Sequence, residues 1–322
     1  MGFNDKKITF AGAGPVGAGT PWGTIAEIMV RLLESRGYET EIETRSSMMN
    51  NARYVSDARA DIGATHVTQL RGAYEATGDW APEGRRENLR VLANVNHPSW
   101  LAIAVRNESE ITDLAQIVAH KIPARIRVSS VRMCQLVCAY YGLDNDVIES
   151  FGASLRVPSD YTHESADFMT APATGYGRVP WVEDGEFDVI IDTIYVGYTP
   201  EVRHFQEAAI LHNLRFLAVP AELQATIEQA GLGRPALLPH KLVRGLFEPV
   251  PSVIRLPHTI YTREDAPGEF VSDVVEAVDE GRIAFRSVHL PFSVDPLDMA
   301  AGYGVPFHPA ALAYYESAGY PH

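Results

Sequence analysis

The sequence has little cysteine and no long hydrophobic run. Its 322 residues include only two cysteines, Cys134 and Cys138, four positions apart in an apolar stretch. Two cysteines at that spacing cannot frame a disulfide-stabilised fold, so we interpret them as buried core residues rather than as a redox or metal pair. No hydrophobic run approaches the ~18 residues that a membrane-spanning helix needs, which argues against insertion into a membrane.

Positive charge is also scarce. The chain has 27 Lys and Arg residues against 41 Asp and Glu residues, a formal net charge of −14. Such a chain repels phosphate backbones and anionic lipid, and it has no basic run to overcome that repulsion. We therefore expect no nucleic-acid or membrane-surface partner. A small anionic ligand stays possible, because helix N-termini, hydroxyl groups and one or two arginines act over short distances.

The first residues contain no signal-peptide pattern. Residues 1–7 lead directly into the apolar segment Ile8–Ala11, which is shorter than the roughly 7–15 apolar residues of a secretion signal. We therefore expect a cytoplasmic protein as the sequence stands, or a periplasmic one if a signal peptide has been removed.

Apolar segments of strand type alternate with segments of helix type. The predicted strands are Ile8–Ala11, Glu39–Thr44, Asp61–Thr65, Leu89–Asn94, Trp100–Arg106, Arg125–Val128, Val189–Thr193 and Ser252–Thr262. The predicted helices cover residues 20–36, 47–59, 130–141, 269–286 and 309–317. This alternation predicts an α/β fold with a largely parallel sheet, and the length predicts two domains. Residues 150–185 are rich in Gly, Pro, Ser and Thr, which predicts a long irregular segment.

A glycine-rich loop follows the first strand. The segment Gly12–Gly17 has the spacing of a dinucleotide-binding fingerprint. In that fingerprint the helix begins at the second glycine, and Pro21 would then lie inside the helix, where proline costs about 3 kcal/mol. A helix with Thr20 as N-cap and Pro21 as its first residue is favourable instead. We therefore favour a small-anion cradle over a nucleotide site or a purely structural turn. The residues assigned to this cradle are Gly14, Gly19, Thr20 and Trp22.

Other polar side chains follow predicted strands, and in open α/β sheets ligands bind at the carboxyl ends of strands. Ser129, Ser130 and Arg132 follow one strand, and two hydroxyls with a guanidinium suit a carboxylate. The alternative is that Ser130 is only an N-cap and Arg132 only a solvated side chain. The remaining ligand-binding candidates at strand ends are Thr65, His66, Thr193, Tyr195 and Tyr198.

The sequence shows no metal-ligand or nucleophile motif. Its eleven histidines lack the spacing of a zinc site, and the chain has no G-x-S-x-G sequence. We therefore expect no metal or cofactor. If the chain is an enzyme, the general acid/base candidates are His66, His97 and Asp192, although structural roles are the alternative for the two histidines.

Several segments resemble the TAXI solute receptors, the extracytoplasmic binding proteins associated with TRAP transporters. The segment Asn51–Arg53 followed by Ala60–Gly63 resembles that family's "G-S-x-E-N-x-R … A-D-I-G" pattern, and Val305–Glu316 resembles its "P-x-H-P-G-A-x-x-Y-Y" tail. The loop Gly12–Gly23 resembles its first ligand-binding loop. The resemblance covers nearly the full chain except residues 150–185. It departs at Thr65 and His66, where the family has glutamine, so the ligand is not carried over.

The resemblance implies a two-lobed type II periplasmic-binding-protein fold with a hinge and a central ligand cleft. Lobe 1 would comprise residues 1–100 and 250–322, and lobe 2 residues 101–249. Asn51 would join the residues above around a small organic anion, a carboxylate given the donors present, and hinge closure would bury it. TRAP membrane subunits are the implied partners. The alternatives are a cytoplasmic lyase, decarboxylase or hydrolase on the same scaffold, and a nucleotide-dependent oxidoreductase.

Overall fold

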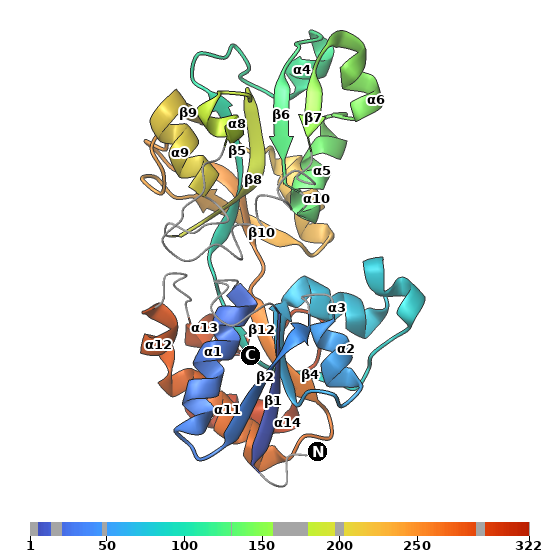
Figure 1. The fold of residues 1–322 in the computed structure, drawn as a ribbon, viewed down its shortest axis with the longest axis vertical. Coiled ribbons are helices and arrows are strands. Elements are labelled where there is room, and N and C mark those ends of the chain that lie inside the picture. The colour runs from blue at the N-terminus through green and yellow to red at the C-terminus, as the bar shows by residue number, and fades with distance from the viewer. Residues whose placement is uncertain are drawn as a thin grey trace. The chain divides into compact units, whose positions relative to one another are not determined.

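The computed structural model describes residues 6–13, 21–46, 50–129, 131–156, 180–196, 203–287 and 294–321. The chain divides into two compact units (Figure 1): unit 1 is Met1–His97 with Leu256–His322, and unit 2 is Pro98–Arg255. Each unit is an α/β structure with its own sheet. The predicted α/β class and the predicted division into two parts are confirmed.

The sheet of unit 1 has the strand order β2-β1-β3-β12-β4. Its strands are β1 (Lys7–Ala13), β2 (Glu39–Ser46), β3 (Ile62–His66), β4 (Leu89–Val95) and β12 (His258–Arg263). Strands β1, β2 and β3 are parallel, and β12 runs antiparallel to both β3 and β4. The carboxyl ends of β1, β2, β3 and β4 therefore share one edge with the amino end of β12.

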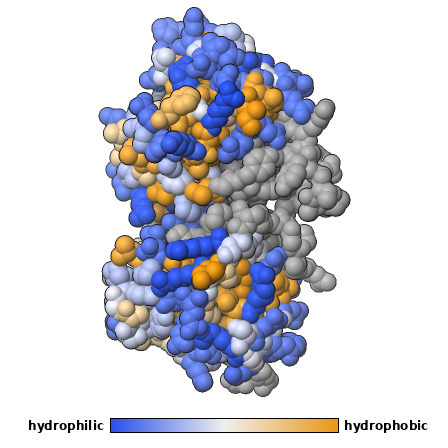
Figure 2. Space-filling view, turned by 90° about the vertical axis from the view of Figure 1, so that its left-hand side faces the viewer, coloured by the Kyte–Doolittle hydropathy of each residue, from blue (hydrophilic) through white to orange (hydrophobic). Residues whose placement is uncertain are grey.

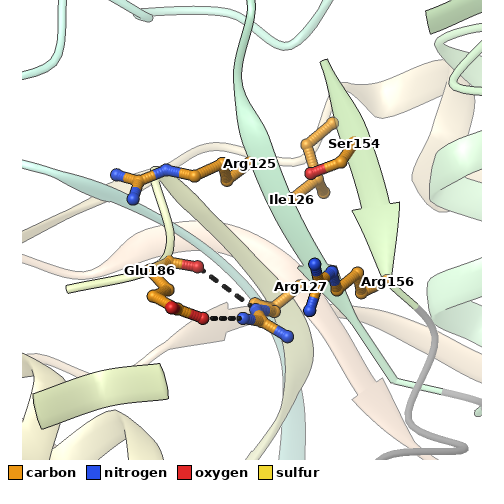
Figure 3. Close-up of a pocket in the computed structure, with 6 residues that line it drawn as sticks. All are labelled: Arg125, Ile126, Arg127, Ser154, Arg156 and Glu186. Atoms are coloured by element: carbon orange, nitrogen blue, oxygen red, sulfur yellow. Dashed lines mark hydrogen bonds and ion pairs between the residues drawn. The ribbon is translucent and has the colours of Figure 1, made fainter. Parts of the chain in front are cut away.

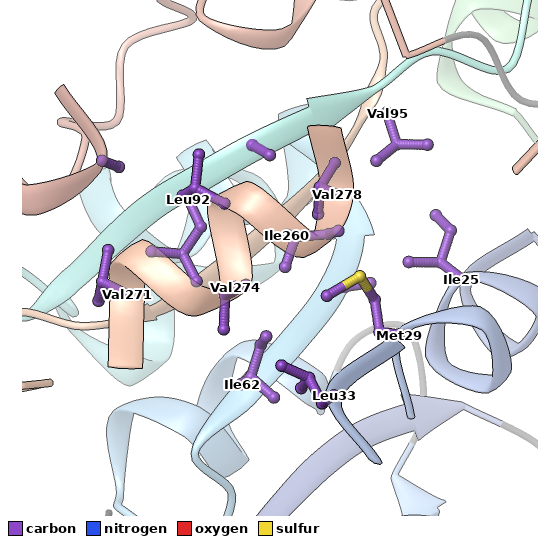
Figure 4. Packing of buried hydrophobic residues seen from close by; sticks show 14 of the residues in the cluster. Ile25, Met29, Leu33, Ile62, Leu92, Val95, Ile260, Val271, Val274 and Val278 are labelled. Atoms are coloured by element: carbon purple, nitrogen blue, oxygen red, sulfur yellow. The ribbon is translucent and has the colours of Figure 1, made fainter. Parts of the chain in front are cut away.

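Helices cover both faces of this sheet. They are α1 (Pro21–Glu34), α2 (Asn51–Ser56), α3 (Val67–Glu75), η2 (Gly78–Glu83), α11 (Gly268–Glu280), α12 (Arg282–Arg286), α13 (Pro296–Met299) and α14 (Pro309–Ala318). Apolar residues of α1 and α11 pack against Ile62, Leu92 and Ile260 of the strands (Figure 4). Residues of α2 and α3 form a second cluster with Tyr261 on the other face. Side chains on one face repeat every 3.6 residues in a helix and every 2 residues in a strand. This repeat directs the apolar side chains of the helices toward the sheet and those of the strands toward the helices.

Unit 2 has a sheet with the order β10-β11-β5-β8-β6-β7, and β9 also pairs with β5. The strands are β5 (Ser99–Arg106), β6 (Arg125–Val128), β7 (Ser154–Arg156), β8 (Val189–Tyr195), β9 (Leu214–Leu217), β10 (Gly233–Leu238) and β11 (Val250–Arg255). The helices are α4 (Ala115–Ala119), α5 (Arg132–Tyr140), α6 (Asn145–Ile148), η3 (Glu149–Phe151), α8 (Pro180–Glu183), α9 (Arg203–His212) and α10 (Ala221–Gln229). One apolar cluster joins the sheet to α5 and α10, and another joins it to α8 and α9.

The sheets are mixed, whereas the sequence predicts a largely parallel sheet. In unit 2 the parallel pairs are β6 with β7 and β6 with β8, and β5 pairs antiparallel with β8, β9 and β11. The segment 150–185, predicted to be irregular, contains β7 and α8, and its residues 157–179 lie outside the described ranges.

The predicted strand Ser252–Thr262 is two strands in two different sheets. β11 pairs with β10 and β5 of unit 2, while β12 pairs with β3 and β4 of unit 1. Pro257 lies between them and has no N–H to donate to a ladder, although its carbonyl accepts a hydrogen bond from Val67 N at 3.0 Å. Because β11 belongs to unit 2, that unit extends to Arg255 rather than to the predicted residue 249.

The predicted helix over residues 269–286 is likewise two helices. α11 ends at Glu280, and α12 begins after Gly281. A Cβ atom at position 281 would lie 2.5 Å from Leu32 Cδ1. Glycine therefore lets α1 approach the junction of the two helices.

Both cysteines are buried, as predicted. Burial raises the pKa of Cys134 well above its usual value, and it raises the pKa of Cys138 to about 12. Both thiols are therefore protonated at neutral pH, which makes them inert core residues.

The face of the molecule in Figure 2 is mainly hydrophilic, with separate hydrophobic areas in each unit. The exposed large apolar residues are Tyr140, Val147, Ile210, Leu211, Leu237, Phe247, Ile283 and Leu297. Within the described ranges, no helix combines the length and the apolar composition that a bilayer crossing requires.

A charged cluster connects α11 to the carboxyl terminus in unit 1. Asp279 accepts hydrogen bonds from Tyr314 Oη at 2.6 Å, from Tyr320 Oη at 2.7 Å and from Arg282 Nε at 2.8 Å. Burial alone would raise the pKa of Asp279, but these three donors outweigh it and lower the pKa below its usual value. The ionised carboxylate therefore stabilises the folded unit.

We expect the substitution Asp279→Asn to destabilise the protein by about 1–3 kcal/mol at pH 7, because it replaces an ionised acceptor of three hydrogen bonds. The folded-state pKa is lowered, so this stabilisation is fully present above the unfolded-state value of about 3.9 and is lost as the pH falls through the folded-state value. Urea unfolding of both proteins between pH 8 and pH 3 measures the difference. The control is Glu280→Gln on the same helix, because the Glu280 side chain is 74% exposed and its ion pair with Arg36 adds little stability. A difference that is the same at pH 3 and pH 7 contradicts the prediction.

Candidate functional site

The carboxyl edge of the unit 1 sheet carries a concentration of buried polar side chains. None of them is more than 9% exposed. We call this set the polar edge of unit 1; its members are Asn51, Thr65, His66, Asn94, Asn96, His97, His258 and Thr259. Buried polar groups cost free energy unless they find hydrogen-bond partners, so such a set at strand ends is typical of a binding site.

The strand order explains why these residues meet. Thr65 and His66 end β3, and Asn96 and His97 follow β4. Because β12 is antiparallel to both strands, its first residue, His258, pairs with His66 on one side and with Val95 on the other. Three helices, α1, α2 and α3, also begin at this edge after β1, β2 and β3. Their first N–H groups face the same end of the sheet, and such groups attract anions.

His66 has a defined orientation at the start of α3. Its Nδ1 accepts a hydrogen bond from Thr68 N at 3.4 Å and lies 2.8 Å from Thr68 Oγ1. A neutral imidazole whose Nδ1 accepts carries its proton on Nε2, so we assign Nε2 as a hydrogen-bond donor. The ring of His258 packs edge to face against that of His66, with centroids 5.5 Å apart. The pair fixes two imidazoles at the end of β3.

Asn51, the first residue of α2, is fully buried. Its Nδ2 donates to Ala64 O at 2.9 Å. Because that carbonyl only accepts, the orientation of the amide is fixed, and Oδ1 must point elsewhere. This buried Oδ1 has no donor among the described residues. It can therefore accept a hydrogen bond from a ligand group such as a hydroxyl.

Two asparagines tie the end of β4 to α13. Asn94 Nδ2 donates to Ala301 O at 2.8 Å and to Asp298 O at 3.1 Å. Asn96 Nδ2 donates to Asp298 Oδ2 at 3.2 Å. The sequence analysis missed Asn94, Asn96 and His258. The rule that selected Thr65 and His66, polar residues at the end of an apolar strand, would also have selected the two asparagines.

The predicted glycine cradle is described only in part. At Gly12 in β1, a Cβ atom would lie 3.0 Å from Ala26 Cβ and 3.1 Å from Ile42 Cγ2, so glycine lets α1 pack closely on the strand. Helix α1 begins at Pro21, as predicted. The other residues assigned to the cradle lie outside the described residues or, for Trp22, have a side chain outside them: Gly14, Gly19, Thr20 and Trp22.

In unit 2, the predicted carboxylate-binding residues lie near the ends of β6 and β8. Ser129 N donates to Ile191 O at 2.9 Å, and Ser129 Oγ accepts from Val131 N at 3.3 Å. Helix α5 begins at Arg132, whose exposed guanidinium donates to Gln135 Oε1 at 3.4 Å. Ser130 and Tyr198 lie outside the described residues.

The end of β8 carries a hydrogen bond that the sequence analysis did not anticipate. Thr193 is buried, and Tyr195 Oη accepts from Arg255 Nη1 at 2.8 Å. Arg255 ends β11, whereas the sequence analysis placed it inside the single predicted strand Ser252–Thr262. An arginine in the middle of an apolar strand gives no signal of a strand end, so the break at Pro257 was the missing information.

The three acid/base candidates are divided between the two units. His66 and His97 belong to unit 1, and Asp192 belongs to unit 2. The histidine beside Asp192 is His204 of α9, with its Nε2 3.3 Å from Asp192 Oδ2. Both side chains are buried, and the rings of Trp181 and Phe205 flank His204. The sequence analysis missed His204, because the helix that carries it was not among the predicted elements.

Among the described residues, no group of three or more His, Cys, Asp or Glu side chains is arranged to hold a metal ion. What the polar edge of unit 1 offers is neutral donors and acceptors together with helix N-termini, a combination that suits an organic anion.

Comparison with known proteins gives a partial family match. The model of the NMT1-like family matches residues 10–133, which include β1 to β6 and the start of α5. No curated protein sequence matches the chain.

The chain is also similar to solved structures at low sequence identity. MatC from Rhodopseudomonas palustris with bound malate is 15% identical over 91% of each chain, with a TM-score of 0.47. The periplasmic aliphatic sulphonate binding protein SsuA from Escherichia coli is 13% identical over 97% of this chain and 78% of its own, with a TM-score of 0.43. XAC2383 from Xanthomonas citri bound to ATP is 11% identical over 97% and 95% of the two chains, with a TM-score of 0.47.

Proposed function

We propose that the chain is a solute-binding protein for a small organic anion, and that the anion is a carboxylate held at the polar edge of unit 1. The observation that carries the proposal is the buried polar set at the strand ends, with two imidazoles in contact and with α1 and α3 beginning after the neighbouring strands β1 and β3. The match to the NMT1-like family supports a solute-binding role.

Each part of the ligand has a partner in this proposal. The carboxylate accepts from His66 Nε2 and from N–H groups at the helix starts. A hydroxyl of the ligand donates to Asn51 Oδ1, whose amide orientation Ala64 fixes. In unit 1, the predicted residues Gly14, Gly19, Thr20 and Trp22 join the proposed ligand-binding set. In unit 2, the residues that stay predicted ligand-binding residues are Ser129, Ser130, Arg132, Thr193, Tyr195 and Tyr198.

The resemblance to TAXI receptors extends the proposal to transport. In that case the protein delivers its solute to TRAP membrane subunits from the periplasm. Of the TAXI-like residues, Asn51 on α2 belongs to the polar edge and Gly63 lies on β3, the strand that carries Thr65 and His66; this placement supports a role for that segment in ligand binding. Co-purification of the chain with a TRAP membrane component tests this part separately.

Thermal unfolding against a library of small molecules tests the ligand class. We expect hydroxycarboxylates and dicarboxylates to raise the midpoint of unfolding, because a ligand that binds only the folded state stabilises it by about 2.7 kcal/mol at a hundred times its Kd. Amines and neutral sugars are the controls. Stabilisation by those controls alone, or by no carboxylate in the library, contradicts the proposal.

A second function rests on the buried Asp192 and His204 pair. A carboxylate 3.3 Å from an imidazole can orient it for general acid/base chemistry, as a lyase, decarboxylase or hydrolase requires. Turnover of a stabilising carboxylate, followed by mass spectrometry, distinguishes an enzyme from a receptor. If the ligand is recovered unchanged after long incubation, the binding function stands and the enzyme alternative does not.

A further inference from the structure

Unit 2 contains a pocket that is rich in arginine, although the chain as a whole carries a charge of −14. The pocket has a volume of about 200 Å³ and lies at the end of the sheet, where β7 is the last strand. Its lining residues are Arg125, Ile126, Arg127, Ser154, Arg156 and Glu186 (Figure 3). It lies on the sheet face that carries Trp181 of α8, opposite the face that α5 covers.

The pairing of β6 with β7 brings the positive charges together. The two strands are parallel, and Arg127 pairs with Arg156 while Arg125 pairs with Ser154. Directly paired residues point to the same face of a sheet from strands about 4.8 Å apart. Two arginines in that position repel each other, and this placement destabilises the sheet unless an anion compensates it.

The acidic residues around the pocket are committed to two of the three arginines. Arg125 binds Asp188 through two hydrogen bonds, of 2.9 and 3.0 Å, and Arg127 binds Glu186 at 3.3 Å. The Arg127 guanidinium also lies over the ring of Trp181 at 5.2 Å. Arg156 has no acidic partner among the described residues. Among the described residues, Arg156 is therefore the pocket arginine that no carboxylate binds, and its positive charge is the one available to an anion.

We propose that this pocket is a binding site for a tetrahedral oxyanion, a phosphate or sulfate group. Arg156 donates to it in the bidentate geometry that guanidinium groups form with such anions, and Arg127 and Ser154 supply further donors from the neighbouring strand positions. The bound anion offsets the repulsion between Arg127 and Arg156. The site is separate from the polar edge of unit 1 and shares no residue with it.

Calorimetric titration of the whole protein with inorganic phosphate at low ionic strength tests the site. We expect saturable binding to one site, and we expect Arg156→Gln to weaken it at least about tenfold, because the variant loses charged hydrogen bonds. The matched control is Arg244→Gln, an exposed arginine of unit 2 that does not line the pocket. It removes the same charge and should leave the affinity unchanged.

Two results overturn the proposal. One is the absence of saturable phosphate binding, or binding that an equal ionic strength of sodium chloride abolishes. The other is an equal loss of affinity in the two arginine variants, which would show a general charge effect instead of a site. Circular dichroism of Arg156→Gln checks that a loss of binding does not come from unfolding, and carboxylate stabilisation of that variant reports on the polar edge independently.

The same titration with sulfate and with methyl phosphate identifies the source of the anion. Equal affinity for inorganic phosphate and sulfate indicates a free inorganic ion. Tighter binding of methyl phosphate indicates that the natural ligand is a phosphorylated molecule whose remainder extends out of the pocket. Either pattern supports the site, whereas the absence of saturable phosphate binding overturns it.

Discussion

Replacing His66 by asparagine is expected to weaken carboxylate binding about tenfold to a hundredfold, the effect of removing one hydrogen bond to a charged group. Asparagine is among the best N-cap residues, so it can keep the cap of α3 that His66 Nδ1 now provides. The asparagine side chain is shorter than that of histidine, so it cannot reach the ligand carboxylate to which His66 Nε2 donates in the proposed complex. Titration of the stabilising carboxylate, with unfolding measured in parallel, separates binding from stability.

The chain offers a closely matched control for this substitution. His308 caps α14 with the same backbone geometry, φ −67° and ψ 139° against φ −67° and ψ 137° at His66, and its Nδ1 accepts from Ala310 N at 3.2 Å. It lies near the start of β4, where its N–H donates to Val91 O, away from the polar edge. His308→Asn should leave carboxylate affinity unchanged. Equal losses in both variants would show that capping, and not the Nε2 donor, governs binding.

The substitution Gly63→Ala is expected to destabilise unit 1 by about 1–3 kcal/mol, the range for overpacking a core. A Cβ atom at this position would lie 2.8 Å from Tyr261 Oη and 3.0 Å from Val55 Cγ2. Both neighbours are fully buried, so neither can move aside into solvent. Urea unfolding measures the loss, and Gly268→Ala is the control because its Cβ would meet Ala310 Cβ at an ordinary 3.6 Å.

A second substitution at Tyr261 tests the cause of that loss. The hydroxyl of Tyr261 is buried without a hydrogen-bond partner among the described residues. Tyr261→Phe alone should therefore cost little, and in combination with Gly63→Ala it should recover part of the lost stability, since the ring carbon Cζ still lies 2.9 Å from the new Cβ. Strictly additive effects would mean that the hydroxyl does not cause the strain.

Much of the fold follows from local patterns in the sequence. Strand β6 matches the predicted bounds, and β1, β3, β4, β5 and α1 match them within a few residues. Most of these elements carry apolar side chains at the period of their type, so local sequence decides whether they form strand or helix. The break at Pro257 was missed although proline, which has no N–H to donate, argues against a continuous strand at that point. Only the pairing shows that the two halves join different sheets.

The candidate site is only partly visible in the sequence. Thr65, His66 and His97 were predicted because they follow apolar strands, and Asn51 was predicted from the resemblance to the TAXI receptors. His258 could not be named, because it joins His66 through the antiparallel insertion of β12, a pairing between residues almost two hundred positions apart. The Arg127 and Arg156 pair depends in the same way on the register of β6 with β7. Contacts of that kind come from topology, which a single sequence does not reveal.

The position of β12 also decides the order in which the chain can fold during synthesis. β12 lies between β3 and β4, although residues 98–255 separate β4 from β12 in the sequence. A chain emerging from the ribosome therefore completes all of unit 2 before the strand that joins β3 to β4 is made. Until then β3 and β4 have an unpaired edge, with Thr65 and Asn94 on it, and such edges are prone to wrong pairing. The residues of the polar edge are thus among the last to be assembled in the nascent protein.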